Sequence, residues 1–368
     1  MNQDKIRAEK YLNASTRQLI WWRYKKHLLA MAGLFCIAGL YVVTIFCEFL
    51  APYDKATFHV DAIYAPPSSI RIFDQDGKIR RPFVYACTLE IDTETQQMCY
   101  VEDTDERFPI RLFVRGDTYE FWGLWESDLH LFGVDAPGHV FLLGTDRMGR
   151  DMFSRCLYGT RISLSIGMVG VFLSLVLGLT LGGISGYMGG WPDGLIQRIV
   201  EVIRCFPSIP LWMGLSAAMP PHWPALKVYF AITIILSLVG WTDLARMVRG
   251  KLFALREEEF VLAARFAGAG HARIIFRHLL PSFMSHIIVT VTLAIPGMIL
   301  AETALSFLGI GLRPPITSLG VLLKEAQNVT TIALYPWLLI PVFFVILIVL
   351  SFNFVGDGLR DAVDPYSR

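Results

Sequence analysis

The chain has 368 residues, of which 54% are hydrophobic and 18% are charged, and its formal net charge is +1. Soluble domains carry roughly a quarter charged residues, so this chain must place much of its apolar surface against something other than water. The balanced charge offers no basic or acidic surplus for a nucleic acid. We therefore expect a membrane protein with no nucleic-acid partner.

Six apolar segments are long enough to cross a bilayer, because a helix needs about 20 mostly apolar residues to span the hydrocarbon. Lipid leaves few other ways to satisfy backbone polar groups, so we expect all six to be helical. The tail 1–27 is basic and polar and shows no small-residue cleavage site, which predicts an uncleaved first span. The predicted spans are 28–50, 162–186, 196–218, 227–248, 284–310 and 334–356.

Orientation follows from lysine and arginine, which are in excess in cytoplasmic loops. The tail 1–27 and the segment 249–281 are rich in both, whereas the connections 219–226 and 312–333 carry only Arg313 and Lys324. We therefore expect both termini, including the tail 357–368, and the segment 249–281 to be cytoplasmic. The stretch 51–161 is too long for the charge rule, and parity places it outside.

The stretch 51–161 is polar and rich in aromatic residues, and it predicts a β-rich domain inserted between the first two spans. Residues 70–73 and 79–85 flank Asp76-Gly77 and read as a hairpin. A second hairpin is predicted from 85 to 101 with its turn near 92–95. Cys87 and Cys99 are symmetric about that turn, so either a disulfide across the strands, which an external compartment permits, or two unpaired thiols fits the sequence.

The segment 144–151 has the glycine spacing of a phosphate loop, which needs G-x-x-x-x-G-K-[ST]. Arg and Asp replace the Lys and the hydroxyl residue here, so nothing is placed to hold Mg²⁺ and the carboxylate would repel phosphate. We exclude nucleotide binding, and two interpretations remain: an external structural turn or a charged cap on the second span. The residues concerned are Gly144, Thr145, Asp146, Gly149, Arg150 and Asp151.

The segment 249–281 is the longest polar connection between two spans and predicts a helix, a sharp turn and a second short helix over 271–280. Gly268 permits the reversal, and small residues before it let another surface approach the backbone. Either an amphipathic helix resting on the membrane or a docking helix for a partner's groove fits this pattern. The apolar positions at helical spacing are Leu252, Leu255, Phe260, Ala263, Ala264 and Phe266.

Ionisable residues inside a membrane suggest function by default, and Glu302, Asp243 and Arg246 lie in the predicted spans. Pro296-Gly297 in the fifth span can bend the helix, as a gate requires. Interfacial contact with water and ordinary packing remain the alternatives for these residues. No metal-binding motif and no nucleophile motif occurs, so we expect neither a metal site nor an enzyme.

The stretch from Glu259 to Gly268, followed by Leu280-Pro281, resembles the EAA loop of bacterial ABC importer permeases. Four further stretches are similar to the dipeptide and oligopeptide permeases of the DppC/OppC type, and the similarity covers roughly 140–366 and the first span. The region 51–140 is longer than in the usual family member, so the resemblance does not identify the precise substrate. These stretches are 143–151, 158–164, 301–309 and 353–365.

The resemblance implies a type I permease fold with a five-helix core over 162–356. It implies a heterodimer with a second homologous permease and one or two ATPase subunits, which hold the ATP and Mg²⁺. It also implies a periplasmic solute-binding protein that delivers the solute to the outer face, and a location in the bacterial inner membrane. The residues expected to contact an ATPase are Glu258, Glu259, Phe260, Ala263, Ala264, Arg265, Gly268, Ala269, Leu280 and Pro281.

The resemblance favours di- or oligopeptides as the solute, with oligosaccharides or another small solute as the alternative. A receptor or scaffold without an ATPase is a rival from another class. A membrane enzyme would need an ionisable cluster facing a cavity, which the sequence does not show.

Overall fold

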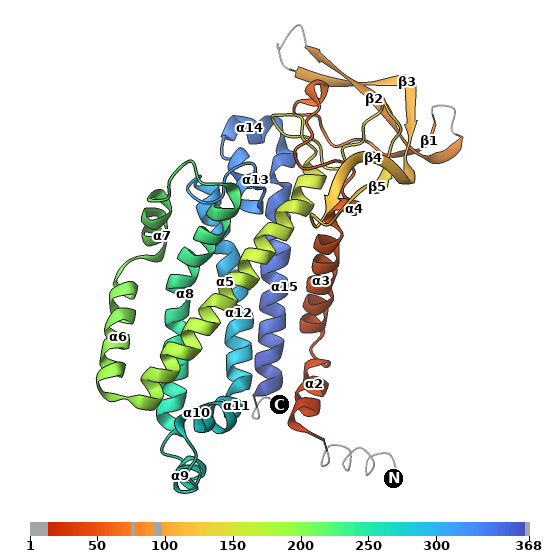
Figure 1. The fold of residues 1–368 in the computed structure, drawn as a ribbon. Coiled ribbons are helices and arrows are strands. Elements are labelled where there is room, and N and C mark those ends of the chain that lie inside the picture. The colour runs from red at the N-terminus through yellow and green to blue at the C-terminus, as the bar shows by residue number, and fades with distance from the viewer. Residues whose placement is uncertain (1–13, 75–77, 92–97, 365–368) are drawn as a thin grey trace, which may run out of the picture. The chain divides into compact units, whose positions relative to one another are not determined.

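The computed structural model describes residues 14–74, 78–91 and 98–364 (Figure 1). The chain divides into two compact units. Within the described residues, unit 1 comprises 14–38, 165–305 and 346–364, and unit 2 comprises 39–164 and 306–345.

Five helical segments among the described residues are long and apolar enough to cross a membrane. They confirm the first, second, fourth, fifth and sixth predicted spans, with shifted ends. The second begins well before the predicted residue 162, so residues 152–161 of the predicted outer domain are helical. The segments are α3 (Leu28–Ile45), α5 (Met152–Met188), α8 (Ala225–Leu255), α12 (Met284–Phe307) and Pro336–Val363, which joins a 3₁₀ turn (Pro336–Leu339) to α15 (Ile340–Val363).

The third predicted span, 196–218, is not one straight helix. It is divided between α6 (Gly190–Cys205) and α7 (Ser208–Ala217), which are bent by 89° relative to each other. Phe206 has an extended backbone with ψ 136°, because the residue before a proline is pushed out of the α region. Pro207 also lacks the N–H that a continuous helix would use, so the break lies at this pair.

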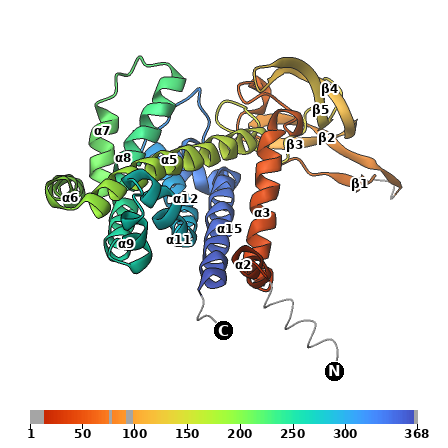
Figure 2. The same ribbon diagram turned by 60° about the horizontal axis from the view of Figure 1, so that its bottom comes forward.

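In unit 1, α5 lies beside α8 (Figure 2), and glycine residues let the two helices pack closely. A Cβ atom at Gly182 would lie 2.6 Å from the carbonyl oxygen of Ala245, and one at Gly186 would lie 2.7 Å from that of Arg249. Both contacts are with α8. Small residues four apart commonly allow membrane helices to bring their backbones together, so α5 and α8 form a tightly joined pair.

Short helices complete unit 1. The predicted helix-turn-helix is present after α8, although its second part is mostly a π-helical segment. The elements are α2 (Thr16–Tyr24), α9 (Glu259–Phe266), α10 (His271–Arg273), the π-helical segment Ile274–Leu279 and α11 (Leu280–Ser282).

Unit 2 contains two antiparallel sheets, one of strands β1-β2-β3 and one of β4-β5. Both predicted hairpins are present, although their turns near 76–77 and 92–95 lie outside the described residues. The second sheet is an additional hairpin that the sequence did not predict. The strands are β1 (Arg71–Phe73), β2 (Ile79–Ile91), β3 (Met98–Pro109), β4 (Arg111–Phe121) and β5 (Trp125–Gly133).

The predicted position of Cys87 opposite Cys99 is wrong. Cys87 pairs with Glu102, and Cys99 pairs with Glu90. Both cysteines are exposed free thiols. A register shift between Tyr85 and Ala86 accompanies this pairing, and the register of a hairpin decides which side chains face each other.

Short helices of unit 2 pack around the start of α5. Ser318 caps one of them, α13, by accepting a hydrogen bond from the Val321 N–H at 3.3 Å, as N-cap serines do. Gly159 of α5 lies close to the backbone at Ser318 and Leu319, so α13 rests directly on α5. The elements are α4 (Cys47–Leu50), a 3₁₀ turn (Val60–Ala62), α13 (Leu319–Glu325) and α14 (Val329–Leu334).

Candidate functional site

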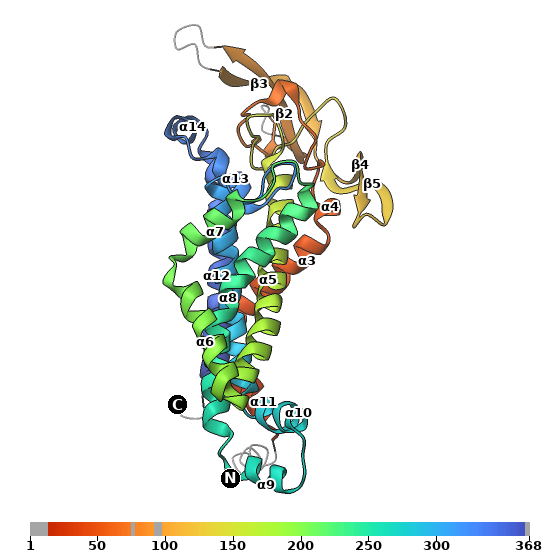
Figure 3. The ribbon, with the colours of Figure 1, turned by 60° about the vertical axis from the view of Figure 1, so that its left-hand side comes forward.

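The loop between α8 and α12 carries α9, which lies with α10 and α11 at one end of the helices of unit 1 (Figure 3). Glu258 takes the N-cap position with an extended backbone, and Glu259 lies in the first turn. A carboxylate at a helix start is stabilised by the exposed N–H groups there. Arg265 lies in the last turn, where a cation is favoured for the converse reason. The charge order of the segment therefore stabilises α9 at both ends.

Gly268 ends α9 with a φ of +78°. The Gly268 N–H donates to the Arg265 carbonyl at 2.9 Å, and the Ala269 N–H donates to the Ala264 carbonyl at 3.0 Å. These two bonds form a Schellman motif, whose left-handed residue is usually glycine because it has no Cβ. Ala264 and Ala269 both pack against the apolar core of unit 1, so the motif lies against the body of the unit.

One apolar side chain anchors α9. Val261 is fully buried, in a cluster with Leu252 of α8 and Ile274 of the π-helical segment. Leu280 belongs to the same cluster, whereas Pro281 is exposed beside it. Because the cluster includes residues from both sides of the loop, α9 is held as a packed element.

A polar contact connects this loop to the end of α5. The guanidinium of Arg265 lies 5.5 Å from the ring centroid of Tyr187, within the range of a cation–π interaction. The Tyr187 hydroxyl lies 3.0 Å from Nδ1 of His271. Tyr187 therefore contacts both α9 and α10.

The outward face of α9 is apolar and unpartnered among the described residues. Phe266 is 91% exposed and Phe260 is 43% exposed. Ala263 lies between them on the sequence and is also exposed. The apolar positions named from the sequence divide between core and surface: Leu252 is buried and Phe266 is exposed, while Val261, which was not among them, is buried.

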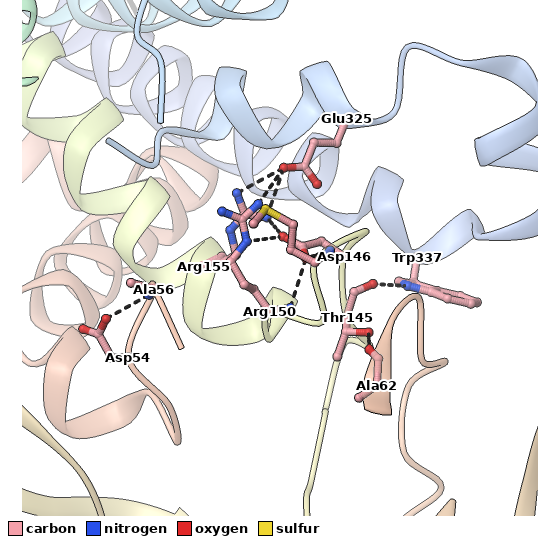
Figure 4. Close-up of polar contacts among 10 residues, drawn as sticks. Asp54, Ala56, Ala62, Thr145, Asp146, Arg150, Arg155, Glu325 and Trp337 are labelled. Atoms are coloured by element: carbon pink, nitrogen blue, oxygen red, sulfur yellow. Dashed lines mark hydrogen bonds and ion pairs between the residues drawn. The ribbon is translucent and has the colours of Figure 1, made fainter. Parts of the chain in front are cut away.

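The segment 144–151 is a structural turn in unit 2, and its first half is held by backbone and side-chain groups that are far away in sequence (Figure 4). The Thr145 hydroxyl accepts from the Ala65 N–H at 2.7 Å and donates to the Ala62 carbonyl at 2.5 Å. The indole N–H of Trp337 donates to the Thr145 carbonyl at 3.0 Å. At Gly149, with φ +70°, a Cβ would lie 2.0 Å from the His59 carbonyl oxygen, so only glycine fits there.

A buried charge cluster occupies the centre of this turn (Figure 4). The Asp146 carboxylate accepts from the Arg150 Nε at 2.7 Å and also contacts the buried Arg155 guanidinium. Glu325 of α13 lies 3.1 Å from Arg150 and 3.2 Å from Arg155. Glu325 was not predicted from sequence, and no local pattern could have indicated a partner so distant along the chain.

Asp151 caps α5. Its carboxylate accepts from the Ser154 N–H and from the Ser154 hydroxyl, both at 2.7 Å. Burial raises the pKa of Asp151 to about 6, although the bonds from Ser154 act in the opposite direction. The segment is therefore a turn that also caps α5, and its external position stays a prediction.

A cavity of about 340 Å³ lies among α5, α7, α8 and α12 of unit 1. Gly297 lines it, whereas Pro296 and Glu302 do not appear in its lining. Glu302 is fully buried in α12. Trp212 of α7 also lines the cavity, and its buried indole N–H has no hydrogen-bond partner in the described structure. The predicted gate residues are thus only partly together, and Trp212 is a lining residue that the sequence did not indicate.

Two family models match the chain. The model described as "Binding-protein-dependent transport system inner membrane component" matches residues 178–368. The model described as "N-terminal TM domain of oligopeptide transport permease C" matches residues 15–67. The matched regions include the α9 loop and the first predicted span.

Curated relatives are similar over large parts of the chain. The dipeptide transport system permease protein DppC of Bacillus subtilis is 32% identical over 372 residues, covering 100% of this chain and 92% of that protein. The oligopeptide transport system permease protein OppC of the same species is 39% identical over 246 residues, covering 66% and 77%. A solved chain of the inward-facing MetNI methionine ABC transporter is 20% identical with a TM-score of 0.45, covering 58% of this chain and 98% of that one.

Proposed function

Since the chain belongs to the family of binding-protein-dependent transport system inner membrane components, we propose that it forms half of the translocation pathway of an ABC importer for di- or oligopeptides. It is a multi-pass inner-membrane permease, and it works with an ATPase and a solute-binding protein. Its full-length similarity to a dipeptide permease supports the peptide substrate. ATP and Mg²⁺ belong to the ATPase subunits, and this chain supplies the path and the mechanical connection.

The single observation that carries the coupling role is the exposed apolar face of α9 on a buried anchor. Phe266 projects from the helix, while Val261 fixes the same helix to the core. Exposed aromatic side chains on a rigid helix are typical anchors for a partner's groove. The small side chain of Ala263 lets that groove approach the helix backbone. These features favour an α9 that docks into an ATPase cleft, rather than an α9 that lies on the membrane surface.

Force from the ATPase would enter at α9 and leave through its packed neighbours. Arg265 and His271 both contact Tyr187 at the end of α5, and Val261 packs against Leu252 of α8. The close backbone contacts at Gly182 and Gly186 join those two helices. A rigid path of this kind transmits a displacement, and closure of two ATPase subunits would supply that displacement.

Orientation and assembly complete the proposal. The arginine-rich α9 loop and both termini are cytoplasmic, and the β-rich part of unit 2 is extracytoplasmic. The 144–151 turn then lies on the side where a periplasmic binding protein delivers the solute. The second half of the pathway comes from a homologous permease, and its face would cover the cavity lined by Trp212 and Gly297.

Affinity purification of the tagged chain from its native membrane tests the proposal. An ATPase, a second permease and a peptide-loaded binding protein are the expected partners. Recovery without an ATPase would support a receptor or scaffold and overturn the importer assignment. If the ATPase is present and the associated binding protein carries an oligosaccharide, the transport role stands and the peptide assignment fails.

A further inference from the structure

A second cavity, of about 440 Å³, lies in unit 2 between the three-stranded sheet and the loops around 59–68 and 137–141. Ligand pockets for small molecules commonly enclose about 300–1,000 Å³, so the size suits one small organic molecule. Tyr85 and Phe108 line it from the sheet, and Phe141 lines it from the loop. None of these residues belongs to the α9 loop, to the 144–151 turn or to the cavity among the spans.

The cavity walls are aromatic. Tyr85 and Phe141 are buried, and Tyr100 and Phe108 are half-buried. The guanidinium of Arg71 lies 5.3 Å from the centroid of the Tyr85 ring, and its charge is balanced by Glu102 at 2.6 Å. Ring faces of this kind attract cations through their quadrupoles.

The imidazole rings of His59 and His139 form part of the cavity wall, and their ring centroids are 4.4 Å apart. Burial lowers the pKa of His59 to about 4, and the neighbouring His139 acts in the same direction. Burial likewise lowers the pKa of His139. Both rings are therefore neutral near pH 7, and the buried Nε2 of His59 has no hydrogen-bond partner among the described residues.

Carboxylates supply the charge of the cavity. Asp61 and Glu106 line it and are exposed, while no lysine or arginine is among its described lining residues. Within the described part of the chain, no three His, Cys, Asp or Glu side chains are arranged to hold a metal ion. Aromatic walls with acidic groups, and no described set of side chains suited to a metal ion, favour an organic cation.

We propose that this cavity binds a protonated primary amine carried on an apolar body, with the ammonium group at Asp61 and Glu106 and the body against the aromatic rings. The ammonium of a peptide amino terminus and that of a small organic amine share this chemistry. The proposal adds a binding site to unit 2 and does not depend on the α9 coupling role.

The free thiol of Cys87 provides a direct readout, because Cys87 lines the cavity and Cys99 on the next strand does not. The reduced full-length protein in nanodiscs is treated with a methanethiosulfonate reagent, and site-resolved mass spectrometry gives the modification rate of each cysteine. We expect 2-phenylethylamine to slow the labelling of Cys87 and to leave Cys99 unchanged. The neutral analogue 2-phenylethanol should protect much less.

Removal of a carboxylate charge from the cavity lining, with a matched control outside the cavity, is the second test. Glu106→Gln should raise the concentration of amine that protects Cys87 by roughly fivefold, whereas Glu120→Gln, at an exposed site on β4 outside the cavity, should have no effect. Both positions are exposed, so neither substitution threatens folding. Equal protection by the neutral analogue, unchanged protection in Glu106→Gln, equal slowing of Cys99, or no protection at millimolar amine would each overturn the proposal.

Two dipeptides distinguish a peptide amino terminus from a small organic amine as the source of the ammonium group. If Phe-Ala protects Cys87 and N-acetyl-Phe-Ala does not, the cavity receives the amino end of peptides. Protection by 2-phenylethylamine alone assigns the cavity to small organic amines. Both results retain the site, because each requires the protonated amine.

Discussion

Replacement of Gly268 by valine should separate ATP hydrolysis from solute uptake. Gly268 has a φ of +78°, and a Cβ there would meet no atom within 4 Å. The penalty is therefore conformational, since an L-residue in the left-handed region costs roughly 1–2 kcal/mol. A factor of ten corresponds to about 1.4 kcal/mol, so the population of the native turn should fall roughly 5- to 30-fold relative to its alternatives.

Gly270 provides the matched control. It also has open space around its Cβ position, but its φ is −70°. Valine adopts that backbone without strain, so Gly270→Val should retain most uptake. Gly268→Asn should lie between the two, because asparagine tolerates the left-handed region better than valine does.

The assay uses proteoliposomes that contain the complete transporter and its loaded binding protein. Uptake of labelled peptide and release of phosphate are measured together, along with the yield of co-purified ATPase. We expect Gly268→Val to lower uptake per ATP hydrolysed, or to lower ATPase recovery. Wild-type values of all three in Gly268→Val would refute the reasoning, and so would equal damage from Gly270→Val.

Three further predictions follow from single side chains. Phe266→Ala should lower ATPase co-purification because it removes the most exposed aromatic group of α9, whereas Phe343→Ala, at another exposed apolar position, should not; equal recovery in both variants would contradict the docking role. Glu325→Ala should lower stability by roughly 3–5 kcal/mol, because it leaves Arg150 and the buried Arg155 with the single carboxylate of Asp146 between them. A thermal melt similar to that of Glu126→Ala, at an exposed strand position, would be evidence against this. The pKa of His59 is lowered from 6.5 to about 4 on folding, so the unfolded state binds more protons and stability should fall as pH drops from about 6.5 towards 4; His59→Phe should show a smaller fall in melting temperature over that window, and an identical pH profile would contradict the assignment.

Local sequence patterns were sufficient where local physics decides the structure. The helical spacing of apolar residues and Gly268 predicted a helix followed by a reversal, and each of these residues acts within one or two turns. The burial of Val261 and the exposure of Phe266 could not be predicted in this way. Their positions depend on how α9 packs against residues from both sides of the loop.

Elsewhere, contacts between residues far apart in the sequence limited what could be predicted. The break in the third span had a local signal in Pro207 that the hydropathy pattern concealed, since both halves are apolar enough to read as one helix. The strand register placed Cys87 opposite Glu102, and a small shift in the register of a hairpin changes every facing pair. Glu325 is 170 residues from Arg155, so only the fold could bring them together.

The glycine contacts between α5 and α8 have a mechanical consequence. At Gly182 and Gly186 the backbones themselves touch, with no flexible side chain between them to absorb a displacement. A carbonyl oxygen cannot rotate out of the way as the tip of a long side chain can. The joint therefore has little side-chain slack, and we expect a displacement of α8 at Leu252 to move α5 with it.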